Sequence, residues 1–437
     1  MLRALSGLFN RPGFHEPVVD GVRAIAILWV FLLHIVFFHI GAFPDRVLDI
    51  FNGTFTQWIG QGDLGVDIFF VISGYLIGTI LLKELRRTHR IDMRRFYGRR
   101  FLRLIPVYAI AMGLGVYFLR NIPKSAILMD IAPSGNIEYA WTNLLYVNNF
   151  VTISKQYMCW CWSLAIEEQF YAIVPFFLLM VVGRSKRPLV WMLVLLFMSG
   201  LIRLAIICGY GIVPPFNDTP DIPDWSLRFD AIYDKLHMRY GGLLAGVIGA
   251  YCSLFHTDAV VRFFSNSFRT TVIGLISLML FGAIAILSFG EEWFASLPRL
   301  FSQVIHSHFC DVFSIAVLFI MLIAIHGCGV LARVMNQLLS TRILYPISQL
   351  SYSIYLLHEM FMLWLFPKTT PWLVDSFGFG PNAVMVVNGI SVTVLTLAAS
   401  AFLYVTVERL CMDYRKSPLF CRLFAPTDLL PAQDTVQ

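Results

Sequence analysis

Residues 19–38 read VDGVRAIAILWVFLLHIVFF, an apolar stretch long enough to cross a membrane that contains one arginine and one histidine. In lipid such a stretch must be helical, because only a helix satisfies its own backbone hydrogen bonds there. Arg23 and His34 are eleven residues apart, so they share one helix face about 16 Å apart. With Arg23 at the membrane surface, His34 lies near the middle of a hydrocarbon layer of roughly 30 Å. An ionisable group at that depth predicts a functional site.

The whole chain has the composition of an integral membrane protein. It has 437 residues, of which 58% are hydrophobic and 14% are charged, and its mean hydropathy is +0.71. Ordinary soluble domains are far less apolar. Apolar runs of spanning length predict an all-α bundle of about ten transmembrane helices. These runs lie near 22–40, 63–82, 101–120, 163–183, 188–209, 238–255, 271–289, 311–331, 344–366 and 382–406.

The distribution of basic residues predicts the orientation of the chain. With the N-terminus inside, 23 of the 33 lysines and arginines lie on the cytoplasmic side, as the positive-inside rule requires. We therefore expect a cytoplasmic segment 1–21, a membrane domain 22–406 and a cytoplasmic tail 407–437. The net charge of +6 mostly reflects this asymmetry, so no nucleic-acid partner is expected. Membrane lipids are expected partners, because basic loops attract anionic headgroups.

The second apolar run, GDLGVDIFFVISGYLIGTI at 62–80, contains a carboxylate and a pair of glycines. The spacing of Gly74 and Gly78 predicts close helix packing. Asp67 needs a cationic or imidazole partner, and we expect His34 to be that partner. A carboxylate that fixes one ring nitrogen of a histidine prepares the other to act as a general base. A structural histidine that bonds a neighbouring helix is the alternative.

A basic run, KELRRTHRIDMRRFYGRRFLRLIP at 83–106, leads into the third helix. Topology alone accounts for most of its charges. Arg99, Arg100 and Arg103, however, recur at helical spacing just before Pro106. They predict a cationic ledge at the cytosolic mouth, suited to a phosphate-bearing donor such as coenzyme A.

The fourth helix begins with a polar face. In CWSLAIEEQFYAIVP, residues 161–175, Ser163, Glu167 and Tyr171 recur every four residues and so line one side. Trp162 is expected at the level of the lipid headgroups.

A similar polar face marks the ninth helix. In LSYSIYLLHEMFMLW, residues 350–364, Ser351, Tyr355 and His358 align, and Glu359 is adjacent. Polar groups from several helices then meet in the outer half of the bundle, which predicts a cavity open to the extracytoplasmic side.

A third polar cluster has the residue types of a metal site. His306 and His308 precede Cys310 and Asp311 in a segment expected to be an outer loop. The spacing of the two histidines suits a strand edge better than a helix face, and we expect no metal here or elsewhere.

The motifs together resemble the acyltransferase type 3 family of bacterial membrane O-acyltransferases. The resemblance rests on VDGVRAIAI with the histidine eleven residues after its arginine, and on GVDIFFVISGYLI, RRFLRLIP, WSLAIEEQFY and SYSIYLLH in the same order. It implies an acyl-coenzyme A donor, usually acetyl-coenzyme A, and an acceptor hydroxyl on an envelope carbohydrate or glycolipid. It further implies a bacterial inner-membrane location and, as partners, other envelope-polysaccharide enzymes. Many relatives carry a C-terminal SGNH hydrolase-like domain, which we do not expect in this chain.

The resemblance also implies that Arg23 and His34 are essential, that Glu167 matters and that the segment ending at Arg103 handles the donor. Oriented by Asp67 or Glu167, His34 would deprotonate the acceptor hydroxyl or would itself carry the acyl group briefly. The candidate residues are, for catalysis, His34, Asp67 and Glu167; for the donor, Arg23, Arg99, Arg100 and Arg103; and for the acceptor, Trp162, Ser163, Tyr171, Tyr355 and His358.

Two other functions fit part of the pattern. Buried histidine, arginine and carboxylates also build the proton relays of transporters, although the interrupted helices in paired halves that mark many transporters are not evident. An acyltransferase that modifies a small secondary metabolite is the second alternative.

Overall fold

The computed structural model describes residues 7–11, 16–122, 135–211, 228–286, 296–415 and 417–424. Helices dominate this part of the chain, and no strand occurs in it. The all-α prediction is therefore confirmed. The expected terminal segments 1–21 and 407–437 lie partly outside the described residues.

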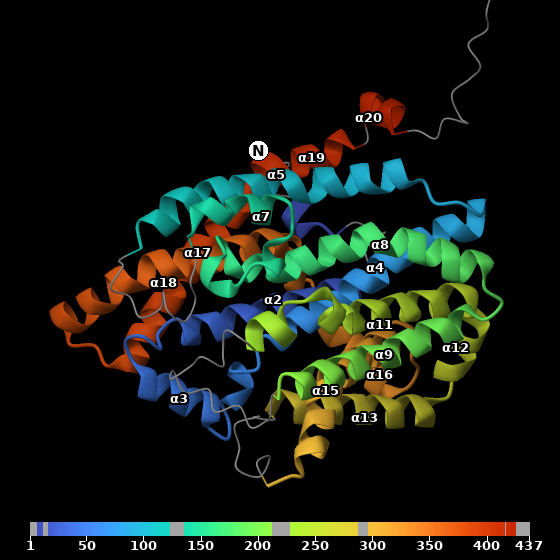
Figure 1. The fold of residues 1–437 in the computed structure, drawn as a ribbon, viewed down its shortest axis with the longest axis horizontal. Helices are drawn as coiled ribbons and strands as arrows, with labels where there is room; N and C mark the ends of the chain where they lie inside the picture. The colour runs from blue at the N-terminus through green and yellow to red at the C-terminus, as the bar shows by residue number, and fades with distance from the viewer. Residues whose placement is uncertain are drawn as a thin grey trace, which may run out of the picture.

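Ten long helices lie roughly side by side along the long axis of the molecule (Figure 1). Each of the ten apolar runs found in the sequence falls on one of them. They are α2 (Pro17–Phe37), α4 (Leu64–Thr88), α5 (Met93–Arg120), α8 (Trp162–Arg184), α9 (Pro188–Gly209), α11 (Leu236–Phe255), α13 (Ser267–Ile286), α15 (Arg299–His326), α17 (Leu344–Phe377) and α18 (Pro381–Leu403).

Fewer than ten of these helices are both long enough and apolar enough to count as membrane spans. Eight helices of the described residues meet both conditions, and a ninth is added if α11 and the short α12 (Thr257–Phe264), which bend by 100°, form one span. The predicted count of ten is thus not confirmed. The long α17 is not among the eight, because serine, tyrosine, histidine and glutamate side chains interrupt its apolar sequence.

The described residues also form short helices. Besides α12 they are α3 (Pro44–Asn52), α7 (Ala140–Leu144), α16 (Val330–Leu339), α19 (Arg409–Tyr414) and α20 (Pro418–Leu423). In Figure 1, α3 and α12 lie at opposite ends of the long axis.

The boundaries of α4 and α5 follow from local sequence. α4 ends at His89, whose backbone is left-handed with φ of 56°. Asp92 then caps α5, since its side chain accepts a hydrogen bond of 3.0 Å from the backbone N–H of Arg95. The basic run thereby forms the first turns of the same helix that continues into the bundle.

Glycines allow α4 and α11 to approach closely. A β-carbon at Gly74 would overlap the carbonyl oxygen of Leu243, and one at Gly246 would overlap that of Val71. Gly78 also faces α11, at Val247. The packing predicted from the glycine pair is confirmed.

The polar helix α17 lies inside the bundle. It packs against α2, α5 and α18, and most of its first twenty residues are buried. This position brings its polar face beside the helix that carries Arg23 and His34.

One expected loop is helical. His306, His308, Cys310 and Asp311 all lie within α15, so the prediction of an outer loop at these residues was wrong. α15 begins at Arg299, twelve residues before Asp311, so these polar residues lie on the same helix as the apolar sequence that follows them.

The described parts of the two terminal segments lie in contact with each other. Gly7, the first described residue, lies against the side chain of Arg409, and α19 packs on α5.

Candidate active site

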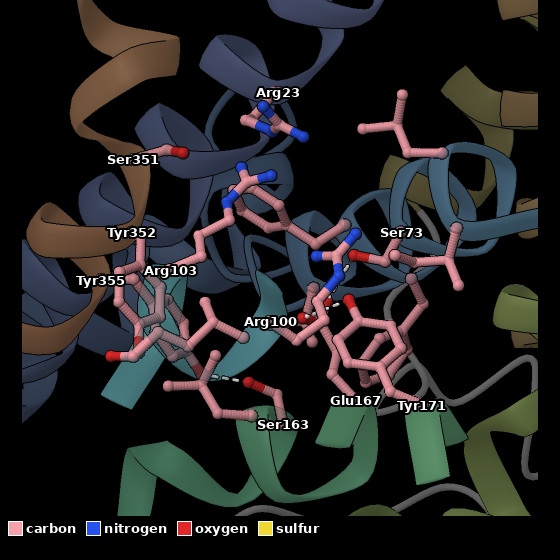
Figure 2. A pocket seen from close by; sticks show the side chains of 17 residues that line it. Arg23, Ser73, Arg100, Arg103, Ser163, Glu167, Tyr171, Ser351, Tyr352 and Tyr355 are labelled. Carbon is pink, nitrogen blue, oxygen red and sulfur yellow. Dashed lines mark hydrogen bonds between the residues drawn. The ribbon is translucent and has the colours of Figure 1, made fainter. Parts of the chain in front are cut away.

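Side chains from five helices enclose an open, polar pocket. It contains about 770 Å³ of non-atom space, open solvent at its mouth included. The helices are α2, α4, α5, α8 and α17. Its polar lining consists of Arg23, Ser73, Arg100, Arg103, Ser163, Glu167, Tyr171, Ser351, Tyr352 and Tyr355 (Figure 2).

Three arginines give the pocket its positive charge. Arg23 from α2 and Arg100 and Arg103 from α5 point their guanidinium groups toward one another across the pocket (Figure 2). The guanidinium carbon of Arg100 lies 5.1 Å from the centre of the Tyr171 ring, a cation–π distance. Arg99 is exposed and does not line the pocket, because neighbouring residues of a helix point about 100° apart. Of the three arginines expected to form a cationic ledge, Arg100 and Arg103 line the pocket and Arg99 does not.

Glu167 lies among these arginines. Its carboxylate accepts a hydrogen bond of 2.7 Å from the Ser73 hydroxyl and one of 3.1 Å from the Tyr171 hydroxyl. The expectation that Glu167 orients His34 is not met, because both ring nitrogens of His34 face residues of α17 instead. The carboxylate instead positions Tyr171 beneath Arg100.

Ser163 and Tyr355 also line the pocket. The Tyr355 hydroxyl lies 2.6 Å from the carbonyl oxygen of Trp160 and 2.6 Å from the Ser163 hydroxyl. A carbonyl only accepts, so the single proton of Tyr355 goes to Trp160. Ser163 must then donate to Tyr355, and the pair links α8 to α17.

The donor and acceptor candidates share this one pocket. The sequence assigned the arginines to the cytosolic mouth and Ser163, Tyr171 and Tyr355 to an outer cavity. The structure places these three residues around the same space as Arg23, Arg100 and Arg103, so the separation was wrong. Eight residues of helix advance about 12 Å, which carries the face from Ser163 down to Tyr171 and into contact with Arg100.

His34 lies between two residues of α17. Its Nε2 is 3.1 Å from Oε1 of Glu359, and its Nδ1 is 3.2 Å from Nε2 of His358. The Nδ1 of His358 is 2.8 Å from the carbonyl oxygen of Tyr355. His358 is fully buried, whereas 21% of the His34 side chain is exposed. The ring is therefore not sealed behind packed side chains.

The carboxylate beside His34 is thus Glu359, which the sequence analysis did not assign to the site. The sequence feature that could have indicated this role is the position of Glu359, directly after a histidine within an apolar helix. His358, expected to contact the acceptor, contacts the other side of the same ring. Helix spacing alone cannot tell which of several buried carboxylates lies beside a given histidine.

Asp67 binds an arginine instead of His34. It is 1% exposed, and its carboxylate oxygens lie 3.0 and 3.2 Å from Nη1 of Arg239 in α11. A second buried ion pair, Arg203 with Asp311 at 3.4 Å, joins α9 to α15. A buried arginine needs a counter-ion in lipid. The presence of Arg239 in an apolar run could therefore have indicated that a buried carboxylate, such as Asp67, is paired with it.

Trp162 is buried rather than placed at the headgroups. It is 5% exposed and does not line the pocket. The guanidinium carbon of Arg239 lies 5.4 Å from the Trp162 ring and 4.4 Å from the Tyr233 ring. The indole therefore covers the Asp67–Arg239 ion pair.

The pocket and His34 are joined through α17 and α2. Tyr355 lines the pocket, and its own carbonyl holds His358, one turn further along α17. On α2, Arg23 lines the pocket and His34 follows three turns later. His34 itself is not part of the pocket lining.

One group of residues in the described part of the chain has the ligand types of a metal site. Ligand atoms of His34, His358 and Glu359 lie within 4.8 Å of one another. However, the Nδ1 of His34 faces His358 while its Nε2 faces Glu359. A single ion needs one nitrogen directed at the same point as the other ligands, so the arrangement suits a hydrogen-bonded chain better than an ion.

The fold and the site define a multi-pass helical membrane protein with a cationic pocket beside a partly exposed histidine. The sequence matches the family described as "Acyltransferase domain" over residues 17–405. The chain belongs to this acyltransferase family.

Two relatives are named O-acetyltransferases. The chain is 30% identical over 355 residues to O-acetyltransferase OatA of Staphylococcus aureus (strain NCTC 8325 / PS 47), which covers 78% of the chain and 50% of that relative. It is 35% identical over 182 residues to Peptidoglycan O-acetyltransferase OatA of Listeria monocytogenes serovar 1/2a, which covers 40% of the chain and 26% of the relative. The chain spans about half the length of the Staphylococcus aureus relative. No solved structure matches the chain.

Proposed function

We propose that the chain transfers an acyl group, preferably acetyl, from acyl-coenzyme A in the cytoplasm to a hydroxyl of an extracytoplasmic or lipid-linked carbohydrate. The observation that carries the proposal is the three-arginine pocket whose wall, at Tyr355, lies one helix turn from the residue that contacts His34.

The donor occupies the pocket. Arg23, Arg100 and Arg103 bind the phosphates of coenzyme A, since planar guanidinium groups match phosphate oxygens with two hydrogen bonds each. The pantetheine arm then runs past Ser163 and Tyr355 toward His34. The acyl thioester reaches the ring at the inner end of this path.

His34 acts as the general base. The proton of the acceptor hydroxyl passes to the ring, and the hydroxyl oxygen bonds to the acyl carbon. The carbon–sulfur bond of the thioester breaks, and the thiolate takes up the proton from His34. The products are the acyl ester and free coenzyme A.

The acceptor approaches the exposed edge of His34, opposite the donor. The name of the Listeria relative makes peptidoglycan, or a lipid-linked precursor of it, the first acceptor to test. This arrangement requires the arginine end of the bundle to face the cytoplasm of a bacterial inner membrane. The contact of Gly7 with Arg409 supports a common compartment for the two terminal segments, and the excess of basic residues on their side supports the cytoplasm.

The decisive experiment compares wild-type and His34→Ala protein in membranes supplied with acetyl-labelled acetyl-coenzyme A and peptidoglycan fragments. Mild base then releases ester-linked label from the glycan. We expect His34→Ala to lower the transfer rate by at least about 100-fold, the usual contribution of a general base. The matched control is His256→Ala, because His256 is exposed and lies outside the pocket.

Thermal unfolding and the elution profile in detergent establish that both variants are folded. Substantial transfer by His34→Ala would refute the proposal. Accumulation of substrate inside vesicles without release of free coenzyme A would favour a transporter instead.

A further inference from the structure

We infer that Glu359 and His34 form one acid–base dyad and that His358 is a positioning residue that directs proton exchange to Nε2 of His34. This inference rests on the proposed function. It follows from the order of donors and acceptors between α17 and α2.

The chain of hydrogen bonds begins at a group that can only accept. The carbonyl oxygen of Tyr355 lies 2.8 Å from Nδ1 of His358, so that nitrogen carries a proton. His358 is 0% exposed, and its Nε2 is 3.9 Å from the nearest carboxylate oxygen, on Glu359. That oxygen lies closer to Nε2 of His34, at 3.1 Å, so a second proton on the buried His358 would have only a shared and more distant counter-ion. The Nε2 of His358 is therefore an acceptor.

This acceptor fixes the protonation of the catalytic ring. The Nδ1 of His34 lies 3.2 Å from Nε2 of His358, and two bare nitrogens at this distance would repel. The Nδ1 of His34 must therefore carry a proton that it donates to His358. Only Nε2 of His34 remains free to exchange a proton with substrates.

Glu359 faces this remaining nitrogen. The distance of 3.1 Å between Nε2 of His34 and Oε1 of Glu359 is that of a hydrogen bond, which requires one proton between the two atoms. The geometry is that of the dyad after it has taken up a proton. When the dyad has given that proton to the leaving thiolate, the carboxylate favours the return of a proton from the next acceptor hydroxyl to Nε2.

The dyad gives separate roles to the two neighbours of His34. Glu359 shares the transferred proton, so it belongs to the reacting groups. His358 touches neither substrate nor the transferred proton, and it acts only through Nδ1 of His34. Removing either side chain should affect turnover, but only a loss at His358 should be repaired by another hydrogen-bond acceptor.

The test uses the full chain in membranes and measures kcat and the donor KM separately. Glu359→Gln should lower kcat by about 100-fold or more, because its amide hydrogen-bonds Nε2 without taking up a proton. His358→Leu should also lower kcat, with the donor KM changed less than about twofold, since the pocket is intact. His358→Gln should recover at least about a tenth of the wild-type kcat, because its amide oxygen can accept from Nδ1. Equal activities of His358→Leu and His358→Gln, or a near wild-type Glu359→Gln, would overturn the inference.

A second measurement does not depend on turnover. Nitrogen-15 NMR of histidine-labelled protein in lipid distinguishes protonated from bare ring nitrogens. We expect Nδ1 of His34 to be protonated in the wild type and to lose this preference in His358→Leu. A bare Nδ1 in the wild type would overturn the inference even if transfer is observed. Absence of transfer by the wild type with a protonated Nδ1 would instead contradict the proposed function alone.

Discussion

Asp67 and Arg239 form a buried ion pair that joins α4 to α11, with a nitrogen–oxygen distance of 3.0 Å and less than a tenth of either side chain exposed. Trp162 and Tyr233 cover the guanidinium group. This pairing indicates a structural role for Asp67, because both of its carboxylate oxygens bond to Arg239.

Asp67→Asn should therefore destabilise the protein rather than remove one catalytic step. The substitution leaves the Arg239 charge buried without a counter-ion, which costs about 3–5 kcal/mol. A lower midpoint of thermal unfolding in detergent checks this expectation. The double variant Asp67→Asn with Arg239→Gln should regain part of the loss. If Asp67→Asn unfolds at the wild-type temperature and yet lacks activity, the carboxylate is catalytic, as the sequence first suggested.

The pocket geometry predicts that adjacent arginines differ in their effect on the donor. Arg100→Gln and Arg103→Gln should each raise the KM for acetyl-coenzyme A by about tenfold or more, since each removes charged hydrogen bonds to phosphate. Arg99→Gln is the matched control, because its side chain is exposed outside the pocket. Its KM should stay within about twofold of the wild type. A comparable rise in Arg99→Gln would show that the whole basic run attracts the donor without a defined site.

The close contact between α4 and α11 predicts that a glycine at the contact tolerates substitution less well than a glycine elsewhere in the bundle. Gly74→Ala places a β-carbon against the backbone of α11, so we expect lower expression and a lower unfolding temperature. Gly113→Ala, in α5, meets no atom within 4 Å. It should be neutral or stabilising by about 0.5–1 kcal/mol, since alanine favours the helix. Equal stability of the two variants would mean that the helices are not in close contact.

The meeting of both termini beside α5 predicts that they face the same compartment. Reporter fusions at residue 7 and after residue 424 should both give the cytoplasmic signal, as the basic loops require. Labelling of single cysteines with an impermeant reagent provides an independent measurement. Termini on opposite sides would exclude the ten-span topology and leave an odd number of spans.

The sequence by itself determined the class of protein and the helices. Apolar runs of spanning length allow no other regular structure in lipid, and each of the ten runs falls on a helix. Local spacing also identified Arg99, Arg100 and Arg103 as a set, of which Arg100 and Arg103 line the pocket, and it marked the polar faces of α8 and α17. These properties depend on residues within a few turns of one another, where helix geometry is fixed.

Only the tertiary structure decided which buried charges meet. The sequence offered Asp67 and Glu167 as partners of His34, whereas the structure pairs them with Arg239 and with the hydroxyls of Ser73 and Tyr171. The residue beside His34 is Glu359, which lies 325 positions away in the chain. Such pairs depend on the rotation and depth of each helix against its neighbours, and helix periodicity specifies neither.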